Sequence, residues 1–180
     1  MDDKQLVDQF LKHKSEKAFN VLYKAKTPHL LQIAMRLTAY DQPMSEDLIQ
    51  EMWCLAIKKI HLFEWRSELK TWLTGILINL ARNKWKEVER DELAHTVLIA
   101  RGENSIAQNF ITAYDLENAI KQLPAGYRQV IILHDIEGYK HNEIAHLLDI
   151  NEGTSKSQLY QARKAMRNNL KEYTINEEKL

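Results

Sequence analysis

Three residues in the second half of the sequence, His141, Glu143 and His146, are of types that bind metal ions. Zinc-binding helices of metalloproteases place two histidines four residues apart, with a glutamate directly after the first. Here the histidines are five residues apart, which turns their rings to different sides of a helix. We therefore expect no metal site. The sequence also has no glycine-rich phosphate loop, nucleophile elbow or Cys-x-x-Cys pair, so we expect neither an enzyme nor a bound cofactor.

A second polar cluster consists of Asp47, Gln50 and Glu51. No nucleophile or metal ligand lies beside these acids in the sequence, so they are not a catalytic pair. By themselves they fit a solvated helix start, where acids interact favourably with the helix dipole.

Basic residues gather in two stretches although the chain as a whole has no net charge, with 25 Lys+Arg and 25 Asp+Glu. Residues 70–86 hold four bases and no acid, and residues 152–171 hold five bases and one acid. These stretches are either ordinary solvated helix faces or two separate places that contact nucleic-acid phosphates. Trp65 stands in a polar loop, which makes it a candidate for stacking on a base.

Composition indicates a helical, globular protein of 180 residues, with 44% hydrophobic and 28% charged residues. Only 5 Gly and 3 Pro are present, which disfavours sheets with many tight turns. The single cysteine, Cys54, excludes a disulfide scaffold within the chain, and we expect a buried, inert thiol, with a redox sensor as the minor alternative. The N-terminus lacks a signal-peptide pattern and no apolar run approaches a membrane span, so we expect a cytoplasmic protein without membrane insertion.

Apolar periodicity predicts an all-α fold of two small helical domains joined by a linker. A helical hairpin or one long helix is expected over about 2–26, and further helices over about 28–40, 45–60 and 70–88, with a restart at Thr27-Pro28 and an N-cap at Ser45. Residues 89–112 are predicted to be an acidic linker, with a helical piece near 92–100. Periodicity then predicts helices near 114–123, 128–134, 140–147 and 152–170, and a frayed tail over 174–180.

The segment 141–159 has the pattern of a helix-turn-helix. Ala145 is the small residue needed where the two helices touch, and Asp149 tolerates left-handed backbone at the turn. Ile144, Leu148 and Ile150 are expected to form a small core beneath the turn. The second helix then presents residues of types that contact phosphates and base edges in a major groove: Asn151, Glu152, Thr154, Lys156, Ser157, Gln158 and Tyr160.

Motifs in both halves resemble one family, the bacterial RNA polymerase sigma factors of the extracytoplasmic-function (ECF) type. The first half carries Ser45-Glu46-Asp47-Leu48-Ile49-Gln50-Glu51, then Lys70-Thr71-Trp72-Leu73, then Asn79-Leu80-Ala81. The second half carries Ile120-Lys121-Gln122-Leu123-Pro124, then Glu137-Gly138-Tyr139, then Gly153-Thr154-Ser155-Lys156-Ser157 with Ala162-Arg163. The resemblance spans about residues 10–86 and 113–170, in the family's order.

This resemblance implies a promoter-specificity subunit with a region 2-like domain at 1–88, the acidic linker at 89–112, a region 4-like helix-turn-helix domain at 113–173 and a tail at 174–180. It implies that core RNA polymerase, promoter DNA and an anti-sigma factor are partners, and that no small molecule is a substrate. Asp47, Gln50 and Glu51 would dock on polymerase. The minus-ten element would be bound by Trp65, Arg66, Ser67, Lys70, Asn79, Arg82, Lys84 and Lys86. The minus-thirty-five element would be bound by Asn151, Glu152, Thr154, Lys156, Ser157, Gln158, Tyr160 and Arg163.

Three departures from the family pattern concern the helix-turn-helix, and the first is Asp149, which replaces the usual turn glycine. Ser155 replaces a usual apolar core residue, and a hydroxyl buried there without a partner would cost stability. Gln158 stands where an arginine is common.

Two alternatives remain open from the sequence. One is a stand-alone helix-turn-helix regulator that binds a palindrome as a dimer, with residues 1–86 as its dimerisation or effector domain. The other is a helical scaffold or enzyme-regulatory protein without a DNA role.

Overall fold

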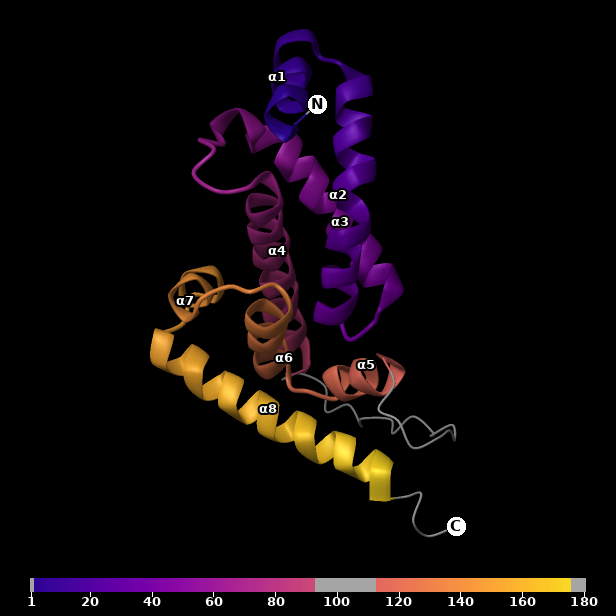
Figure 1. Ribbon diagram of the computed structural model, residues 1–180, viewed down its shortest axis with the longest axis vertical. Coiled ribbons are helices and arrows are strands. Elements are labelled where there is room, and N and C mark those ends of the chain that lie inside the picture. Colours follow the sequence, from indigo (N-terminus) through magenta and orange to yellow (C-terminus); the bar gives the residue numbers. More distant parts are fainter. Residues whose placement is uncertain (1, 93–112, 176–180) are drawn as a thin grey trace. The chain divides into compact units, whose positions relative to one another are not determined.

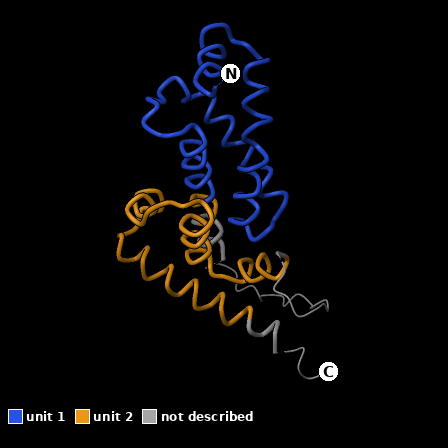
Figure 2. The backbone as a smooth tube through the Cα atoms, viewed as in Figure 1, with its two compact units in different colours: residues 1–81 blue, residues 82–180 orange. Residues whose placement is uncertain are grey.

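The computed structural model describes residues 2–92 and 113–175, and every regular element in that part of the chain is helical. The predicted all-α fold is therefore confirmed. The chain divides into two compact units, residues 1–81 and 82–180 (Figure 2). Within the described residues, no helix combines the length and the apolar character needed to cross a membrane.

The first unit contains α1 (Asp3–His13), α2 (Glu16–Leu37), α3 (Gln42–Lys59), the short 3-10 helix η1 (Ile60–Leu62) and the first part of α4 (Leu69–Glu92). Helix α2 packs against both α1 and α3 (Figure 1). The core is made of large aliphatic side chains that are essentially fully buried: Leu22, Leu30, Ile33, Leu37, Leu48, Met52, Leu69, Leu73, Leu77 and Ile78.

The predicted helix restart at Thr27-Pro28 is wrong, because α2 runs through Pro28 without interruption. The break lies earlier, where Lys14 adopts left-handed backbone (φ 50°) and the Ser15 hydroxyl accepts the N–H of Ala18 at 3.3 Å. A proline removes one N–H from the helix ladder and leaves the carbonyl four residues earlier without its donor. Pro28 and Lys24 are both exposed, so water can solvate that carbonyl.

The predicted N-cap at Ser45 is also wrong. Helix α3 begins three residues earlier, where the Asp41 carboxylate accepts the N–H of Met44 at 3.0 Å and Pro43 occupies the first turn. Ser45 is instead fully buried, and its hydroxyl donates to the Asp41 carbonyl at 2.6 Å and lies 2.7 Å from the Thr38 hydroxyl. These bonds anchor the start of α3 to the end of α2.

The second unit contains α5 (Ala113–Lys121), α6 (Ala125–Ile131), which continues as the π-helix η2 (Ile132–Ile136), then α7 (His141–Leu148) and α8 (Glu152–Ile175). Helix α8 packs against α5, α6 and α7. Its buried side chains, Ser155, Leu159, Ala162 and Met166, follow helical spacing along one face.

The turn of the helix-turn-helix is confirmed. Asp149 ends α7 in left-handed backbone, with φ 57° and ψ 49°. Ile144 and Leu148 are buried as expected, whereas Ala145 and Ile150 are only half-buried.

Helix α4 extends to Glu92, four residues beyond its predicted end, and so occupies the first part of the predicted linker. The rest of that linker, with its predicted helical piece, lies outside the described residues, as does the end of the tail from residue 176.

Candidate protein and nucleic-acid interfaces

Helix α3 presents one exposed polar face. Asp47, Gln50 and Glu51 are all exposed, and residues three and four apart in a helix lie side by side. The buried Leu48, Met52 and other core residues of α3 lie on a different side of the helix. The structure therefore brings the three predicted polymerase-binding residues together.

Cys54 lies on the same face, because it follows Gln50 by four residues and Glu51 by three. The expectation of a buried thiol is wrong, since Cys54 is exposed. Its apolar neighbour Trp53 is the residue that turns into the core.

Trp65 lies in the loop between η1 and α4, but it is not a free ring. Its centroid is 4.8 Å from that of Phe63, and Phe63 in turn stacks on Trp72 at 5.1 Å. Trp65 is half-buried and has φ 58°, a left-handed conformation that is strained for a bulky residue. The loop thus holds one indole ring in a defined place against Phe63.

Arg66 and Ser67 complete the exposed part of this loop. The Arg66 guanidinium pairs with the Glu64 carboxylate at 2.7 Å, and both side chains are largely exposed. The Ser67 hydroxyl donates to the Glu68 carbonyl at 3.4 Å. Both residues remain accessible to a ligand.

The predicted minus-ten residues of α4 do not all share one face. Asn79 is exposed, while Lys70 is half-buried on the side that carries the fully buried Leu77, seven residues on. Nine residues separate Lys70 from Asn79, which puts them on opposite sides of the helix. Arg82 and Lys84 are half-buried, and the Lys86 side chain lies outside what the structure describes.

Helix α8 presents an exposed face with hydroxyl, aromatic and basic groups. Lys156, Ser157 and Tyr160 are exposed, Tyr160 by 63%, and Asn151 and Glu152 are exposed at the start of the helix. Thr154 is half-buried. Gln158 is half-buried over Gly126 of α6, where an added Cβ would lie only 3.1 Å from the Gln158 Nε2 atom. Gln158 is therefore partly committed to packing.

Lys164 and Arg167 belong to the basic stretch at 152–171 but were not among the predicted minus-thirty-five residues, and both are exposed on α8. Their spacing from the buried Leu159 and Ala162 contains the signal, because it places them away from the core side of the helix.

Two of the predicted DNA-binding bases on α8 have acidic partners. The Lys156 ammonium lies 2.6 Å from the Glu152 carboxylate, one turn earlier in the same helix. Arg163 forms a bidentate pair with Asp135 of η2, at 2.9 Å from Nε and 2.6 Å from Nη2. This pair lowers the pKa of Asp135 and raises that of Arg163. The sequence did not reveal Asp135 as a partner, because 28 residues separate the two.

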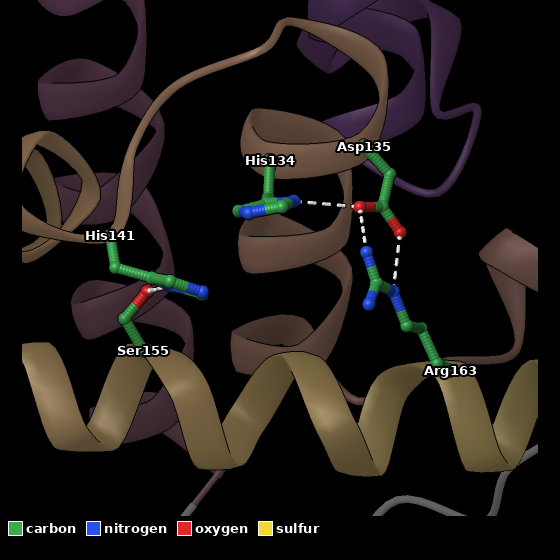
Figure 3. Close-up of polar contacts among 5 residues, drawn as sticks. All are labelled: His134, Asp135, His141, Ser155 and Arg163. Atoms are coloured by element: carbon green, nitrogen blue, oxygen red, sulfur yellow. Dashed lines mark hydrogen bonds and ion pairs between the residues drawn. The ribbon is translucent and has the colours of Figure 1, made fainter.

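The buried Ser155 hydroxyl has a partner. Its Oγ lies 2.9 Å from the Nδ1 atom of His141 at the start of α7 (Figure 3). The His141 ring stacks on that of His134, with centroids 4.6 Å apart, and the His134 Nδ1 donates to Asp135 at 2.7 Å. Burial is the first cause that lowers the pKa of His141, followed by its electrostatic interactions with His134 and Lys156.

Two of the three residues whose types could bind a metal ion, His141 and Glu143, form hydrogen bonds within the protein. His141 is engaged with Ser155, and Glu143 accepts the backbone N–H of Lys140 at 2.7 Å. Among the described residues, no group of three or more His, Cys, Asp or Glu side chains is arranged to hold a metal ion.

Both halves of the chain match models of known protein families. Residues 22–91 match the family model for sigma-70 region 2, and residues 114–166 match that for sigma-70 region 4. The ECF RNA polymerase sigma-E factor of Haemophilus influenzae is 28% identical over 187 residues, covering 92% of this chain and 96% of that relative. The corresponding factor of Escherichia coli is 29% identical over 185 residues, covering 91% and 94%.

Two solved structures are also similar to this chain. The sigma factor RpoE in complex with the anti-sigma factor NepR, from Bartonella quintana, has a TM-score of 0.67 and 29% identity, and covers 86% of this chain and 98% of that one. CnrH in complex with the cytosolic domain of CnrY has a TM-score of 0.59 at 23% identity, over 94% and 97%, and supports the fold alone.

Two sigma-70 regions in this order define a promoter-specificity subunit of bacterial RNA polymerase, which directs initiation by binding core polymerase and the minus-ten and minus-thirty-five elements. Sigma factors are non-enzymatic regulatory subunits. The comparisons do not favour the alternative that this chain is a stand-alone helix-turn-helix regulator. The chain belongs to the sigma factors of the extracytoplasmic-function type.

Proposed function

We propose that the exposed face of α3 formed by Asp47, Gln50 and Glu51 docks on core RNA polymerase. The observation that carries this assignment is their joint exposure on one helix face, within the segment that matches sigma-70 region 2. Two carboxylates there favour a basic partner surface, and such complementarity acts on the association rate and on partner choice.

The loop at Trp65–Ser67 reads the minus-ten element. Extruding a base from the duplex costs a few kcal/mol, which contacts in the protein must offset. An indole held against Phe63 offers a stacking surface without first having to be ordered. Arg66 and Ser67 add exposed donors beside it, and the exposed Asn79 extends the contact along α4, whereas the half-buried Arg82 donates from Nη1 to the Leu147 carbonyl at 3.5 Å.

Helix α8 reads the minus-thirty-five element through its exposed face. Lys156, Ser157 and Tyr160 are the best placed of the predicted residues, because they are exposed on the helix that follows the turn at Asp149. Lys164 and Arg167 add phosphate contacts further along the helix. Each unit alone binds DNA weakly, and attachment of both units to one polymerase raises their effective concentration.

The protein has no catalytic activity of its own, acts in the cytoplasm and takes no small molecule as substrate. The domain limits near residues 88 and 113 are supported by the two family matches, which end at residue 91 and begin at residue 114. An anti-sigma factor is a further partner. The support is the solved complex of RpoE with NepR, since RpoE is 29% identical to this chain.

Binding of the full-length protein to core polymerase tests the docking assignment. We expect the variant Asp47→Ala with Glu51→Ala to bind core polymerase at least about tenfold more weakly, the equivalent of about 1.4 kcal/mol. The matched control removes two exposed acids outside α3, Asp8 and Glu16, and should bind normally. Equal affinity of both variants for core polymerase would contradict the assignment.

A further inference from the structure

Helix α8 is held at two positions by polar contacts, Ser155 with His141 and Arg163 with Asp135 (Figure 3), and the stacked rings of His141 and His134 lie between the two positions. We call this group of contacts the polar clasp, and its members in order are Ser155, His141, His134, Asp135 and Arg163. We propose that Asp135 and His141 are positioning residues for minus-thirty-five recognition, which orient α8 without contacting DNA. The proposal rests on the assignment of α8 as the helix that reads this element.

The first anchor is at Ser155, a fully buried residue on the core side of α8. A buried hydroxyl needs a hydrogen-bond partner, and here the His141 Nδ1 atom supplies it at 2.9 Å. His141 is the first residue of α7, so the bond joins the two helices of the helix-turn-helix. A hydrogen bond depends on distance and angle, so it restricts rotation of α8 about its axis more than apolar packing alone does.

The second anchor is at Arg163, two turns further along α8. Its guanidinium meets both oxygens of the Asp135 carboxylate, at 2.9 and 2.6 Å. A bidentate pair fixes the direction of the approach as well as the distance. The anchors are eight residues, or about 12 Å, apart along the helix. Between them lie the exposed Lys156, Ser157 and Tyr160.

The two anchors are connected. His134 donates to Asp135 at 2.7 Å, and its ring stacks on His141 at 4.6 Å. The two anchors therefore belong to one network of contacts. Groups of one network do not contribute additively when they are removed.

The clasp assigns Arg163 a role different from the one that its charge suggests. The Nε and Nη2 groups of its guanidinium are already used by Asp135, so Arg163 holds the helix instead of binding DNA directly. The alternative is that Arg163 binds a phosphate and Asp135 only competes with the DNA for it. The two roles predict opposite signs for removal of the Asp135 carboxylate, because removal would free Arg163 under the alternative and would loosen α8 under the clasp.

The experiment measures transcription by core polymerase in the presence of the full-length protein. A promoter is first selected from genomic fragments that the wild-type protein transcribes, and two templates are then made from it. One template is an intact duplex. The other is opened beforehand at the minus-ten element and lacks the minus-thirty-five element. The variants are Asp135→Ala, Arg163→Ala, their double mutant, His141→Ala and His141→Asn, with Glu117→Ala as a carboxylate-removal control outside the clasp.

We expect Asp135→Ala to lower transcription from the intact duplex about tenfold, with the double mutant no worse than either single variant. All variants should transcribe the opened template within about twofold of wild type, because loss of positioning in α8 does not affect that template. His141→Asn should recover most of the loss caused by His141→Ala, since the Asn amide can occupy the place of Nδ1.

Unchanged or increased transcription with Asp135→Ala on the intact duplex would overturn the proposal. An equal loss on both templates would also overturn it, because it would indicate general unfolding. Failure of the wild-type protein on both templates would instead contradict the proposed promoter function itself.

Discussion

The hydroxyl of Ser155 is fully buried, while its partner His141 is only half-buried, so the two ends of their 2.9 Å hydrogen bond differ in access to water. The hydrogen bond offsets the loss of stability that the sequence suggested for a buried hydroxyl at Ser155. A hydroxyl in a position that is usually apolar is tolerated because a histidine from the next helix satisfies it.

The asymmetry predicts unequal costs of truncation. His141→Ala leaves the Ser155 hydroxyl buried without a partner and should lower the free energy of unfolding by about 1–3 kcal/mol. Ser155→Ala leaves an imidazole that water can still reach, and should cost less. Adding Ser155→Ala to His141→Ala should therefore recover stability in urea unfolding. A double mutant less stable than His141→Ala alone would contradict this account.

Acid should destabilise the protein in two steps. The folded pKa of His141 lies below its ordinary value, so the unfolded chain takes up this proton first as the pH falls. The free energy of unfolding should therefore decrease as the pH falls through about 6.5, until the folded pKa is passed. The pKa of Asp135 is also lowered, so its contribution is lost later, as the pH falls through its folded value.

Urea unfolding followed by circular dichroism at a series of pH values measures these steps. His141→Asn cannot titrate, so the upper step should diminish in this variant while the lower step remains. If His141→Asn lost the same unfolding free energy near pH 6.5 as the wild-type protein, the upper step would belong to another titratable group.

The backbone at Trp65 predicts a difference between two truncations. Its φ of 58° suits glycine and disfavours residues with a Cβ. Both Trp65→Gly and Trp65→Ala lose the indole contact with Phe63, but the glycine variant should be more stable by about 1 kcal/mol in thermal unfolding. Both variants should form fewer open complexes at the minus-ten element, measured by permanganate reactivity. Normal promoter opening by both would remove Trp65 from the minus-ten assignment.

Cys54 offers a probe of the α3 face, because it is the single cysteine of the chain and lies beside Gln50 and Glu51. A bulky maleimide attached to Cys54 should block binding to core polymerase, and bound polymerase should slow the labelling. Cys54→Ser treated with the same reagent should bind normally. Labelled protein that still binds polymerase with unchanged affinity would exclude this face from the interface.

Periodicity predicted the elements well where one apolar stripe dominates, as in α4 and in the helix-turn-helix around Asp149. It failed at Pro28 and Ser45, because local signals compete there. A proline is tolerated inside α2 at an exposed position, and Asp41 outcompetes Ser45 as the N-cap. Such competition is decided by burial, which a single sequence does not specify.

In the candidate site, too, some features could be predicted from the sequence and others could not. Exposure of Asp47, Gln50 and Glu51 followed from helical spacing and the family pattern. The pairing of Arg163 with Asp135 did not, because the contact joins residues 28 positions apart and depends on how α8 packs against η2. The family resemblance and the basic stretch at 152–171 had suggested that Arg163 contacts DNA.

Run-off transcription by core polymerase, with and without this protein, on a pool of genomic fragments is the most direct measurement of its promoter specificity. We expect new discrete transcripts with the wild-type protein, and their loss with Asp47→Ala plus Glu51→Ala, while the control variant lacking the Asp8 and Glu16 carboxylates retains them. Absence of new starts, combined with a palindromic footprint of the protein alone on DNA, would contradict the sigma-factor account.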